Sequence, residues 1–332
     1  MSMIDERQLL ELLADGAFHS GQDLAVKLGI SRSAVWKRLQ QLQKTLDIDL
    51  YAVSGKGYKL AKPLQLLDPA RLRQSLHQQI VLKRLPEIEV HLSLDSTSRQ
   101  ALELSRHAPA TPRLVLAEMQ TAGRGRRGRQ WLSPFGSNLY LSLYWWFDVM
   151  PESIATLSLV VGTILARRLE ALGVPRCELK WPNDVRYQGK KLAGILLEMQ
   201  GEASGGCGIV IGVGINLDMT GNEAEAIAQP WTDVKRILGE DIDRNQFAAR
   251  LTADLIETLS QYSRDKVLAC LDAWRCRDVL NGQEVMLELP TETLHGTARG
   301  IDSQGALLLE QQGQIRHFFS GELSVRLAEQ NN

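Results

Sequence analysis

Apolar side chains recur every three to four residues along residues 1–45, and this spacing predicts three helices. The first helix ends at Asp15-Gly16. In SGQDLAVKLGISRSAVWKRLQQLQ, a serine precedes each of the next two helices, and Gly29 separates them. The alternating residues of IDLYAVSGKGYKLA then predict a β-hairpin. These elements together predict a small helical domain with a hairpin wing over residues 1–62.

The order of these elements resembles the winged helix-turn-helix of bacterial repressors. Residues 31–60 carry six lysines and arginines against two aspartates, so the segment is locally basic in a chain of net charge −1. Basic side chains on a helix and at the tip of a wing suit contacts to DNA phosphates. The candidate DNA-binding residues are Ser31, Arg32, Ser33, Lys37 and Lys56. The alternative is a three-helix interaction module whose charges face solvent.

Residues 63–275 begin within a proline-marked linker at 61–70 and mix two kinds of pattern. The segments 113–120, 192–198 and 208–219 have the apolar runs of β-strands, whereas 157–166 is typical of a buried helix. We therefore expect a mixed β-sheet with helices in this part of the chain.

The last region, residues 276–332, alternates short apolar runs with turns. The turns fall at Asn281-Gly282, at 302–305 and at Gln312-Gly313. Five or so short strands in such a length predict a small β-barrel.

Composition excludes several classes of protein. The chain of 332 residues is 44% apolar and nearly neutral, so no global field marks a wholesale binder of polyanions. Its four cysteines show no C-x-x-C spacing, which argues against a structural zinc site or a disulfide framework. The N-terminal stretch lacks the basic and apolar regions of a signal peptide, and no apolar run is long enough to span a bilayer. We expect a cytoplasmic protein that does not bind membranes.

The stretch GRGRRGR at 123–129 raises the question of function. Its glycines fit G-x-G-x-x-G, the spacing of a dinucleotide-binding turn, and a predicted strand precedes them. However, Pro134 and Gly136 prevent a helix from opening after the glycines, so no helix N-terminus would meet a pyrophosphate. Four arginines on a flexible loop instead favour a clamp that becomes ordered around an anionic ligand. A solvated basic loop is the alternative.

Three further segments place polar residues beside predicted strands. LKWPNDVRYQGKKLAGILLEMQ carries a turn with Lys180, Asn183 and Asp184, followed by a strand with Lys191 and Gly194. Asn216 ends the strand of GIVIGVGINLDM, and Ser96, Thr97 and Ser98 precede the helix of LSLDSTSRQALEL. Each segment alone also has a structural explanation, such as a helix cap or close packing at glycine.

The motifs EMQTAGRGRRGRQWLSPFGSNLYLS, KWPND, GKKLAGIL and IGVGIN occur in that order behind the winged helix. This combination closely resembles the bifunctional biotin–protein ligase/biotin operon repressor family, over essentially the whole chain. The resemblance implies an α+β multidomain fold: the winged helix-turn-helix, a central mixed β-sheet with helices related to lipoate ligases, and a C-terminal SH3-like β-barrel. It also implies that biotin and Mg·ATP form biotinyl-5′-AMP, whose acyl group passes to a lysine of biotin carboxyl carrier protein.

The resemblance further implies a regulatory role and a set of site residues. The adenylate would act as a corepressor that promotes homodimer formation and binding to operator DNA. The residues expected to contact biotin or its adenylate are Ser96, Thr97, Ser98, Gln120, Gly123, Arg124, Gly125, Arg126, Lys191 and Gly194. Relatives often carry Asn where this chain has Ser98. Trp131 is expected to stack on adenine, and Asn183, Asn216 and Arg129 to lie near Mg·ATP.

The chemistry of these residues agrees with acyl-adenylate formation. Biotin's carboxylate is ionised at neutral pH, so catalysis requires alignment of two anions and neutralisation of developing charge. Lys191 and Arg126 would supply this neutralisation, and Mg²⁺ would arrive with ATP rather than in a cage of protein ligands. The attacking lysine of the carrier must be neutral, and Asp184 is the candidate acceptor of its proton. Two alternatives are a biotin-sensing repressor without catalysis and a ligase for a related acyl group such as lipoate.

Overall fold

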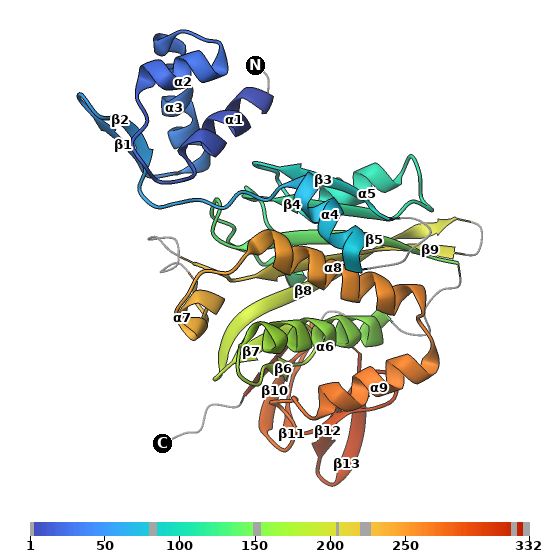
Figure 1. Cartoon of the computed structure of the whole chain (residues 1–332). Helices are drawn as coiled ribbons and strands as arrows, with labels where there is room; N and C mark the ends of the chain where they lie inside the picture. The colour runs from blue at the N-terminus through green and yellow to red at the C-terminus, as the bar shows by residue number, and fades with distance from the viewer. Residues whose placement is uncertain are drawn as a thin grey trace, which may run out of the picture.

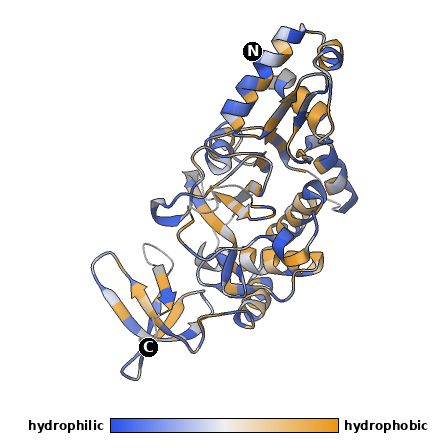
Figure 2. Ribbon diagram, turned by 90° about the vertical axis from the view of Figure 1, so that its left-hand side faces the viewer, coloured by the Kyte–Doolittle hydropathy of each residue, from blue (hydrophilic) through white to orange (hydrophobic). Residues whose placement is uncertain are grey.

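The computed structural model describes residues 3–79, 85–148, 154–203, 206–219, 227–319 and 324–327. The helical N-terminal domain, the central sheet with its helices and the C-terminal sheet follow one another along the long axis of the molecule (Figure 1). The view turned by 90° also shows the C-terminal sheet at one end of the molecule and the N-terminal helices at the other (Figure 2). No helix among the described residues has the length and apolar character needed to cross a membrane.

The N-terminal domain forms the predicted winged helix-turn-helix. Its elements are α1 (Met3–Leu13), α2 (Gly21–Leu28), α3 (Arg32–Leu46), β1 (Leu50–Val53) and β2 (Gly57–Leu60). Ser20 and Ser31 cap α2 and α3 by accepting hydrogen bonds from the backbone N–H three residues on, as their positions predict. Gly29 ends α2 with a φ of 64°, in the left-handed region that glycine adopts without strain. Ala25 of α2 is buried in the same core cluster as Val35 and Leu39 of α3, where its small side chain suits close helix packing.

A seven-stranded sheet forms the centre of the molecule, in the order β3-β4-β5-β9-β8-β7-β6. Only β3 and β4 pair in parallel; the other neighbours are antiparallel, so the sheet is mixed as predicted. The strands are β3 (Glu87–His91), β4 (Arg113–Ala117), β5 (Leu139–Phe147), β6 (Glu178–Lys180), β7 (Asp184–Tyr187), β8 (Lys190–Ala203) and β9 (Gly206–Ile215). The strands predicted at 113–120 and 208–219 are shorter than expected, ending at Ala117 and Ile215.

Helices cover the two faces of this sheet unequally (Figure 1). Four helices share a large apolar core with one face: α4 (Pro69–Gln79), α6 (Ile154–Leu172), α8 (Arg244–Ser260) and α9 (Arg264–Arg275). The predicted buried helix at 157–166 lies within α6. The other face carries α5 (Thr97–Ser105), whose Ala101 packs on Val115, Tyr144 and Val210. The loop at 123–131 lies over another part of that face. A short helix, α7 (Val234–Leu238), follows β9 along the chain.

The C-terminal region contains the expected five strands, paired in the order β13-β12-β11-β10-β14. Their bounds are β10 (Glu284–Glu288), β11 (Thr293–Ile301), β12 (Leu307–Gln311), β13 (Gln314–Phe318) and β14 (Ser324–Leu327). Trp181 Nε1, from the turn between β6 and β7 of the central sheet, donates a hydrogen bond of 3.0 Å to the Gly305 carbonyl. Because Leu287, Leu307 and Phe318 also join the core of the central sheet, the C-terminal sheet is fixed against the sheet that carries the site.

A buried ion pair joins the linker after the winged helix to the central sheet. Arg244 Nη2 lies 2.9 Å from Glu118 Oε2, and the two side chains are only 7% and 0% exposed. Glu118 Oε1 accepts the backbone N–H of Leu67, while Arg244 donates to the carbonyls of Gln65, Gly136 and Asn138. The pair therefore connects residues 65–67 to the segment that leads from the loop at 123–131, which we call the arginine loop, into β5.

Asp278 lies between α9 and the C-terminal sheet, and its buried carboxyl group is costly to ionise. Its carboxylate accepts the Leu280 N–H at 2.9 Å, but its Oδ2 is buried with no hydrogen-bond partner among the described residues. Burial raises the pKa of Asp278 from 3.8 to about 6. Because this carboxyl ionises less readily in the folded chain than in the unfolded one, its charge opposes folding above about pH 6. The opposition fades as the pH falls towards 4.

We therefore expect Asp278→Asn to stabilise the protein at pH 8, by at most about 3 kcal/mol. The free energy of unfolding should change little at pH 4, where the wild-type carboxyl is already neutral. Urea titrations of both proteins at pH 4, 6 and 8 measure this. Equal pH dependence of the two proteins would contradict the assignment of a raised pKa to Asp278.

Candidate functional site

The site lies on a stretch of sheet that lacks side chains. Gly194 of β8 pairs with Gly214 of β9, and Gly212 is two residues along the same face. A Cβ added at Gly214 would come within 2.5 Å of the Trp131 ring, and one at Gly194 within 2.9 Å. A Cβ at Gly212 would lie 2.7 Å from Ser98 Oγ. These glycines let the arginine loop and α5 approach the strand backbone, which leaves a pocket between them.

The arginine loop forms a short hairpin. Gly125 N donates to Arg129 O at 2.7 Å, and Trp131 N donates to Gly123 O at 2.9 Å. The turn is a single 3-10 turn over Arg126–Gly128, with Arg127 at a φ of 58°. No helix follows the glycines, as the sequence predicts. The loop is more regular than expected, because the glycines permit a hairpin whose backbone groups bond to one another.

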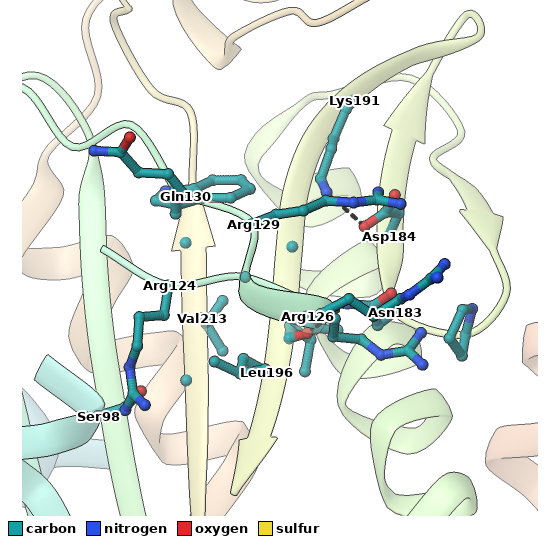
Figure 3. A pocket seen from close by; sticks show the side chains of 18 of the residues that line it. Ser98, Arg124, Arg126, Arg129, Gln130, Asn183, Asp184, Lys191, Leu196 and Val213 are labelled. Atoms are coloured by element: carbon teal, nitrogen blue, oxygen red, sulfur yellow. Dashed lines mark hydrogen bonds and ion pairs between the residues drawn. The ribbon is translucent and has the colours of Figure 1, made fainter. Parts of the chain in front are cut away.

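The arginines of the loop point to opposite ends of the pocket. Figure 3 shows Arg124 extending towards Ser98, whereas Arg126 and Arg129 extend towards Asn183 and Asp184. The pocket is therefore bipolar in its chemistry. One end is lined by hydroxyl and amide groups together with Arg124, and the other by Arg126, Arg129, Lys191 and Asp184.

The polar end is a connected network of buried groups. Ser96, Thr97 and Ser98 are all at least 95% buried at the start of α5. Gln120 Oε1 accepts hydrogen bonds from both the N–H and the hydroxyl of Thr97. Ser142 Oγ lies 2.8 Å from Thr97 Oγ1 and 3.0 Å from Ser98 Oγ. Although Ser96 stands at the N-cap of α5, its side chain makes no cap hydrogen bond, so the helix-cap explanation does not account for it.

Arg124 is held by a residue that the sequence interpretation missed. Its Nη2 lies 2.9 Å from Glu198 Oε2 on β8. Strand alternation contained the signal, because residues 194, 196 and 198 share one face. The Nε atom of Arg124 is buried and has no hydrogen-bond partner among the described residues. Glu198 thus pairs with the Nη2 atom of Arg124, and the Nε–H group of Arg124 is available to another acceptor.

The charged end is organised by Asp184 and Lys191. Lys191 Nζ lies 2.7 Å from Asp184 Oδ1 and 5.3 Å from the centre of the Trp131 ring. Burial lowers the pKa of the Arg126 guanidinium, and the nearby Asp184 charge partly opposes this. Burial also lowers the pKa of Lys180, a pocket residue that ends β6 rather than lying on the predicted turn. One carboxylate thus lies among several cations, an arrangement suited to an anionic ligand.

Trp131 lies between the loop and the bare strands. Its Nε1 is buried and has no hydrogen-bond partner among the described residues. With Arg124 Nε, it is the second unsatisfied buried donor beside the pocket. Each unsatisfied buried donor calls for an explanation, and beside a pocket an acceptor on a bound ligand is one.

The remaining predicted residues occupy different positions. Asn183 lines the pocket, but its Nδ2 donates to Ile195 O at 2.7 Å. Asn216 is 3% exposed, and its Nδ2 donates to Thr232 O at 3.1 Å in the wall of an adjoining hollow. Arg129 lines both hollows. At the mouth, Arg127 Nη1 lies 3.7 Å from Glu288 Oε2 of β10, so the loop also contacts the C-terminal sheet.

The predicted DNA-binding residues share a second surface. Ser31, Arg32, Ser33 and Lys37 are exposed on the first turns of α3. Arg32 and Lys56 line a hollow between α3, the start of α2 and the wing. Ser31 also has a structural role, because its hydroxyl accepts the Ala34 N–H at 3.2 Å.

Three family descriptions match successive parts of the chain. Residues 5–59 match an HTH domain, residues 91–216 the Biotin/lipoate A/B protein ligase family, and residues 281–326 the Biotin protein ligase C terminal domain. The bifunctional ligase/repressor BirA of Salmonella typhimurium is 41% identical, and that of Escherichia coli 40%; each alignment covers 97% of both chains. A structure of biotin protein ligase from Aquifex aeolicus in complex with biotin and ATP aligns with a TM-score of 0.62 at 27% identity. That alignment covers 74% of this chain and 100% of the other.

Proposed function

The chain belongs to the family of bifunctional biotin ligases and repressors, and we propose that its pocket binds biotin at the polar end and ATP at the charged end. Biotin and ATP are the substrates of this enzyme. The observation that carries the assignment of the two ends is the divergence of the loop arginines. Arg124 lies at the end of the pocket that holds the hydrogen-bonded Thr97 and Gln120. Arg126 lies at the end that holds Lys191 and Asp184.

In the first step, a carboxylate oxygen of biotin attacks the α-phosphorus of ATP, pyrophosphate leaves, and biotinyl-5′-AMP forms. The attacking group is already an anion, so no general base is required. Lys191 and Arg126 lower the repulsion between the two anions and stabilise the charge that develops on the phosphate oxygens. The short hairpin of the loop positions Arg126 before substrate binds, which reduces reorganisation during the reaction.

The residues of the charged end suit a magnesium ion that arrives with ATP. Asp184 is the pocket's nearest carboxylate to Lys191, and no group of three potential metal ligands occurs among the described residues. Mg²⁺ takes one or two carboxylates and otherwise coordinates phosphates and water. The ion would neutralise phosphate charge when bound, while Asp184 would face it together with the side-chain oxygen of Asn183.

In the second step, a lysine amine of biotin carboxyl carrier protein attacks the acyl carbon of the adenylate. The amide bond forms, AMP leaves, and the amine loses a proton. Asp184 is the proposed acceptor of that proton, because it supplies the carboxylate that lines the charged end. Trp131 would stack on the adenine and, with Lys191, close this end of the pocket.

The same adenylate is the proposed corepressor. Arg244 offers a route from the arginine loop towards the linker of the DNA-binding domain, because it donates to the carbonyls of Gly136 and Asn138, which follow the loop, and to that of Gln65 in the linker. We propose that the adenylate-bound chain forms a homodimer, binds operator DNA and represses biotin biosynthesis genes. ATP, carrier and DNA occur together in the cytoplasm, where we place the protein.

We expect adenylate to strengthen operator binding, and the binding to weaken steeply with salt because lysines and arginines displace counterions from DNA. The test titrates DNA from the control region of a biotin biosynthesis gene with protein incubated with biotin alone, or with biotin, ATP and Mg²⁺. Repeating the titrations at several salt concentrations gives the number of phosphate contacts. Equal affinity with and without adenylate would remove the corepressor role and leave the ligase role intact.

A further inference from the structure

The recognition helix α3 presents a large apolar side chain that its core does not use. Trp36 is 50% exposed, although the buried positions of the same helix are filled by Val35, Leu39, Leu42 and Leu46. Tryptophan is highly buried on average, whereas the core of this domain is built without Trp36. Trp36 therefore requires an explanation other than packing within the domain.

The neighbours of Trp36 are the residues that would meet a nucleic acid. Arg32, Ser33, Lys37 and Gln40 lie one turn or less from Trp36 and are all exposed. Arg32 also lines the hollow that contains the wing residues 52–58, among them Lys56. Lys56 and Lys59 of the wing lie over the ring of Phe18, at 5.8 and 5.1 Å, so both charges stay close to one aromatic side chain. The surface around Trp36 is thus complementary in charge to a phosphate backbone.

On α3, the residues suited to phosphate contacts and the residue suited to base contacts occupy different positions. In a helix-turn-helix, residues in the first turns of the second helix enter the major groove. Arg32 and Lys56, on both sides of the hollow, suit phosphate contacts. Trp36, between Arg32 and Gln40 on successive turns, then faces the base edges. The apolar group that base edges present in the major groove is the 5-methyl group of thymine.

We propose that Trp36 is a specificity-determining residue that packs on a thymine methyl group in the major groove of duplex DNA. This inference rests on the proposed operator binding and adds the kind of base that the surface selects. Removing the indole should reduce affinity for a preferred duplex while leaving the phosphate contacts, and hence general DNA binding, in place.

The test uses the full chain with biotin, ATP and Mg²⁺, and duplexes selected from a randomised library by the wild-type protein. Wild type, Trp36→Ala and Ile315→Ala are titrated with a selected duplex and with a random-sequence duplex of equal length. Ile315 is the matched control, because it is 54% exposed on β13 at the other end of the molecule. Each thymine of the selected duplex is then replaced by uracil, which removes only the methyl group.

We expect Trp36→Ala to weaken binding to the selected duplex about tenfold and binding to the random duplex less than twofold. Uracil at one position should weaken wild type about fourfold, the effect of one lost methyl contact, and should not weaken Trp36→Ala further. Ile315→Ala should match wild type throughout.

Several results would overturn the proposal. If uracil affects wild type and Trp36→Ala equally, the indole does not contact a methyl group. If Trp36→Ala weakens both duplexes equally, the indole packs on the sugar-phosphate backbone. If Trp36→Ala changes only the sedimentation of the protein, the surface contacts a second copy of the chain. A wild type that enriches no duplex would refute operator binding itself, an outcome distinct from the other three.

Discussion

Lys191→Met is expected to slow formation of biotinyl-5′-AMP by about 100- to 1,000-fold, the effect of losing one donor that stabilises transition-state charge. Lys191 Nζ is a cation of the pocket's charged end, lying against both Asp184 and Trp131. Methionine keeps most of the apolar stem over the Trp131 ring but cannot neutralise a phosphate oxygen. It also leaves Asp184 without its partner, which adds repulsion towards ATP.

The adjacent Lys190 provides a matched control. It is exposed at the start of β8, beyond the pocket. Lys190→Met removes the same charge from the same strand and should change the rate less than twofold. Single-turnover measurements with saturating biotin and ATP separate the chemical step from binding. Equal rates for Lys191→Met and Lys190→Met would show that Lys191 is not part of the catalytic site.

Arg244→Met is expected to lower the free energy of unfolding by about 3–5 kcal/mol, the cost of leaving a buried charge unpaired. Glu118 is fully buried, and Arg244 supplies the positive charge opposite it. The same substitution removes hydrogen bonds to the carbonyls of Gln65, Gly136 and Asn138. For a domain of this size, the thermal midpoint should fall by about 10 °C.

The exposed pair of Arg106 with Glu103 is the control for this prediction. Its side chains are 63% and 56% exposed, so Arg106→Met should change stability by less than about 1 kcal/mol. Differential scanning calorimetry of the two variants and wild type gives the comparison. If Arg244→Met were no more destabilising than Arg106→Met, the buried pair would not hold the linker to the sheet.

Local patterns were sufficient to predict the elements of this fold. The caps at Ser20 and Ser31 and the break at Gly29 depend on interactions within a few residues, so the sequence alone locates them. The five C-terminal strands were predictable for the same reason, since turn residues separate short apolar runs. The strand ends at Ala117 and Ile215 were not, because pairing with neighbouring strands decides where a strand stops.

Contacts between distant segments could not be read from the sequence. Arg124 meets Glu198 across 74 positions, and Arg244 meets Glu118 across 126. The number of possible partners for one arginine is too large for spacing to select among them. The motifs did identify both ends of the pocket, because the glycines and charged residues that form it cluster within short segments. The partners that hold those residues in place required the folded chain.

The most direct test of the proposed chemistry is biotin-dependent exchange of labelled pyrophosphate into ATP by the purified full chain. Exchange requires reversible formation of biotinyl-5′-AMP, so it reports the first step without a carrier protein or DNA. We predict exchange with biotin, ATP and Mg²⁺, a rate near background when biotin or Mg²⁺ is omitted, and a comparable loss for Lys191→Met. No exchange at saturating biotin, ATP and Mg²⁺ would contradict the assignment of the pocket as a site of adenylate synthesis.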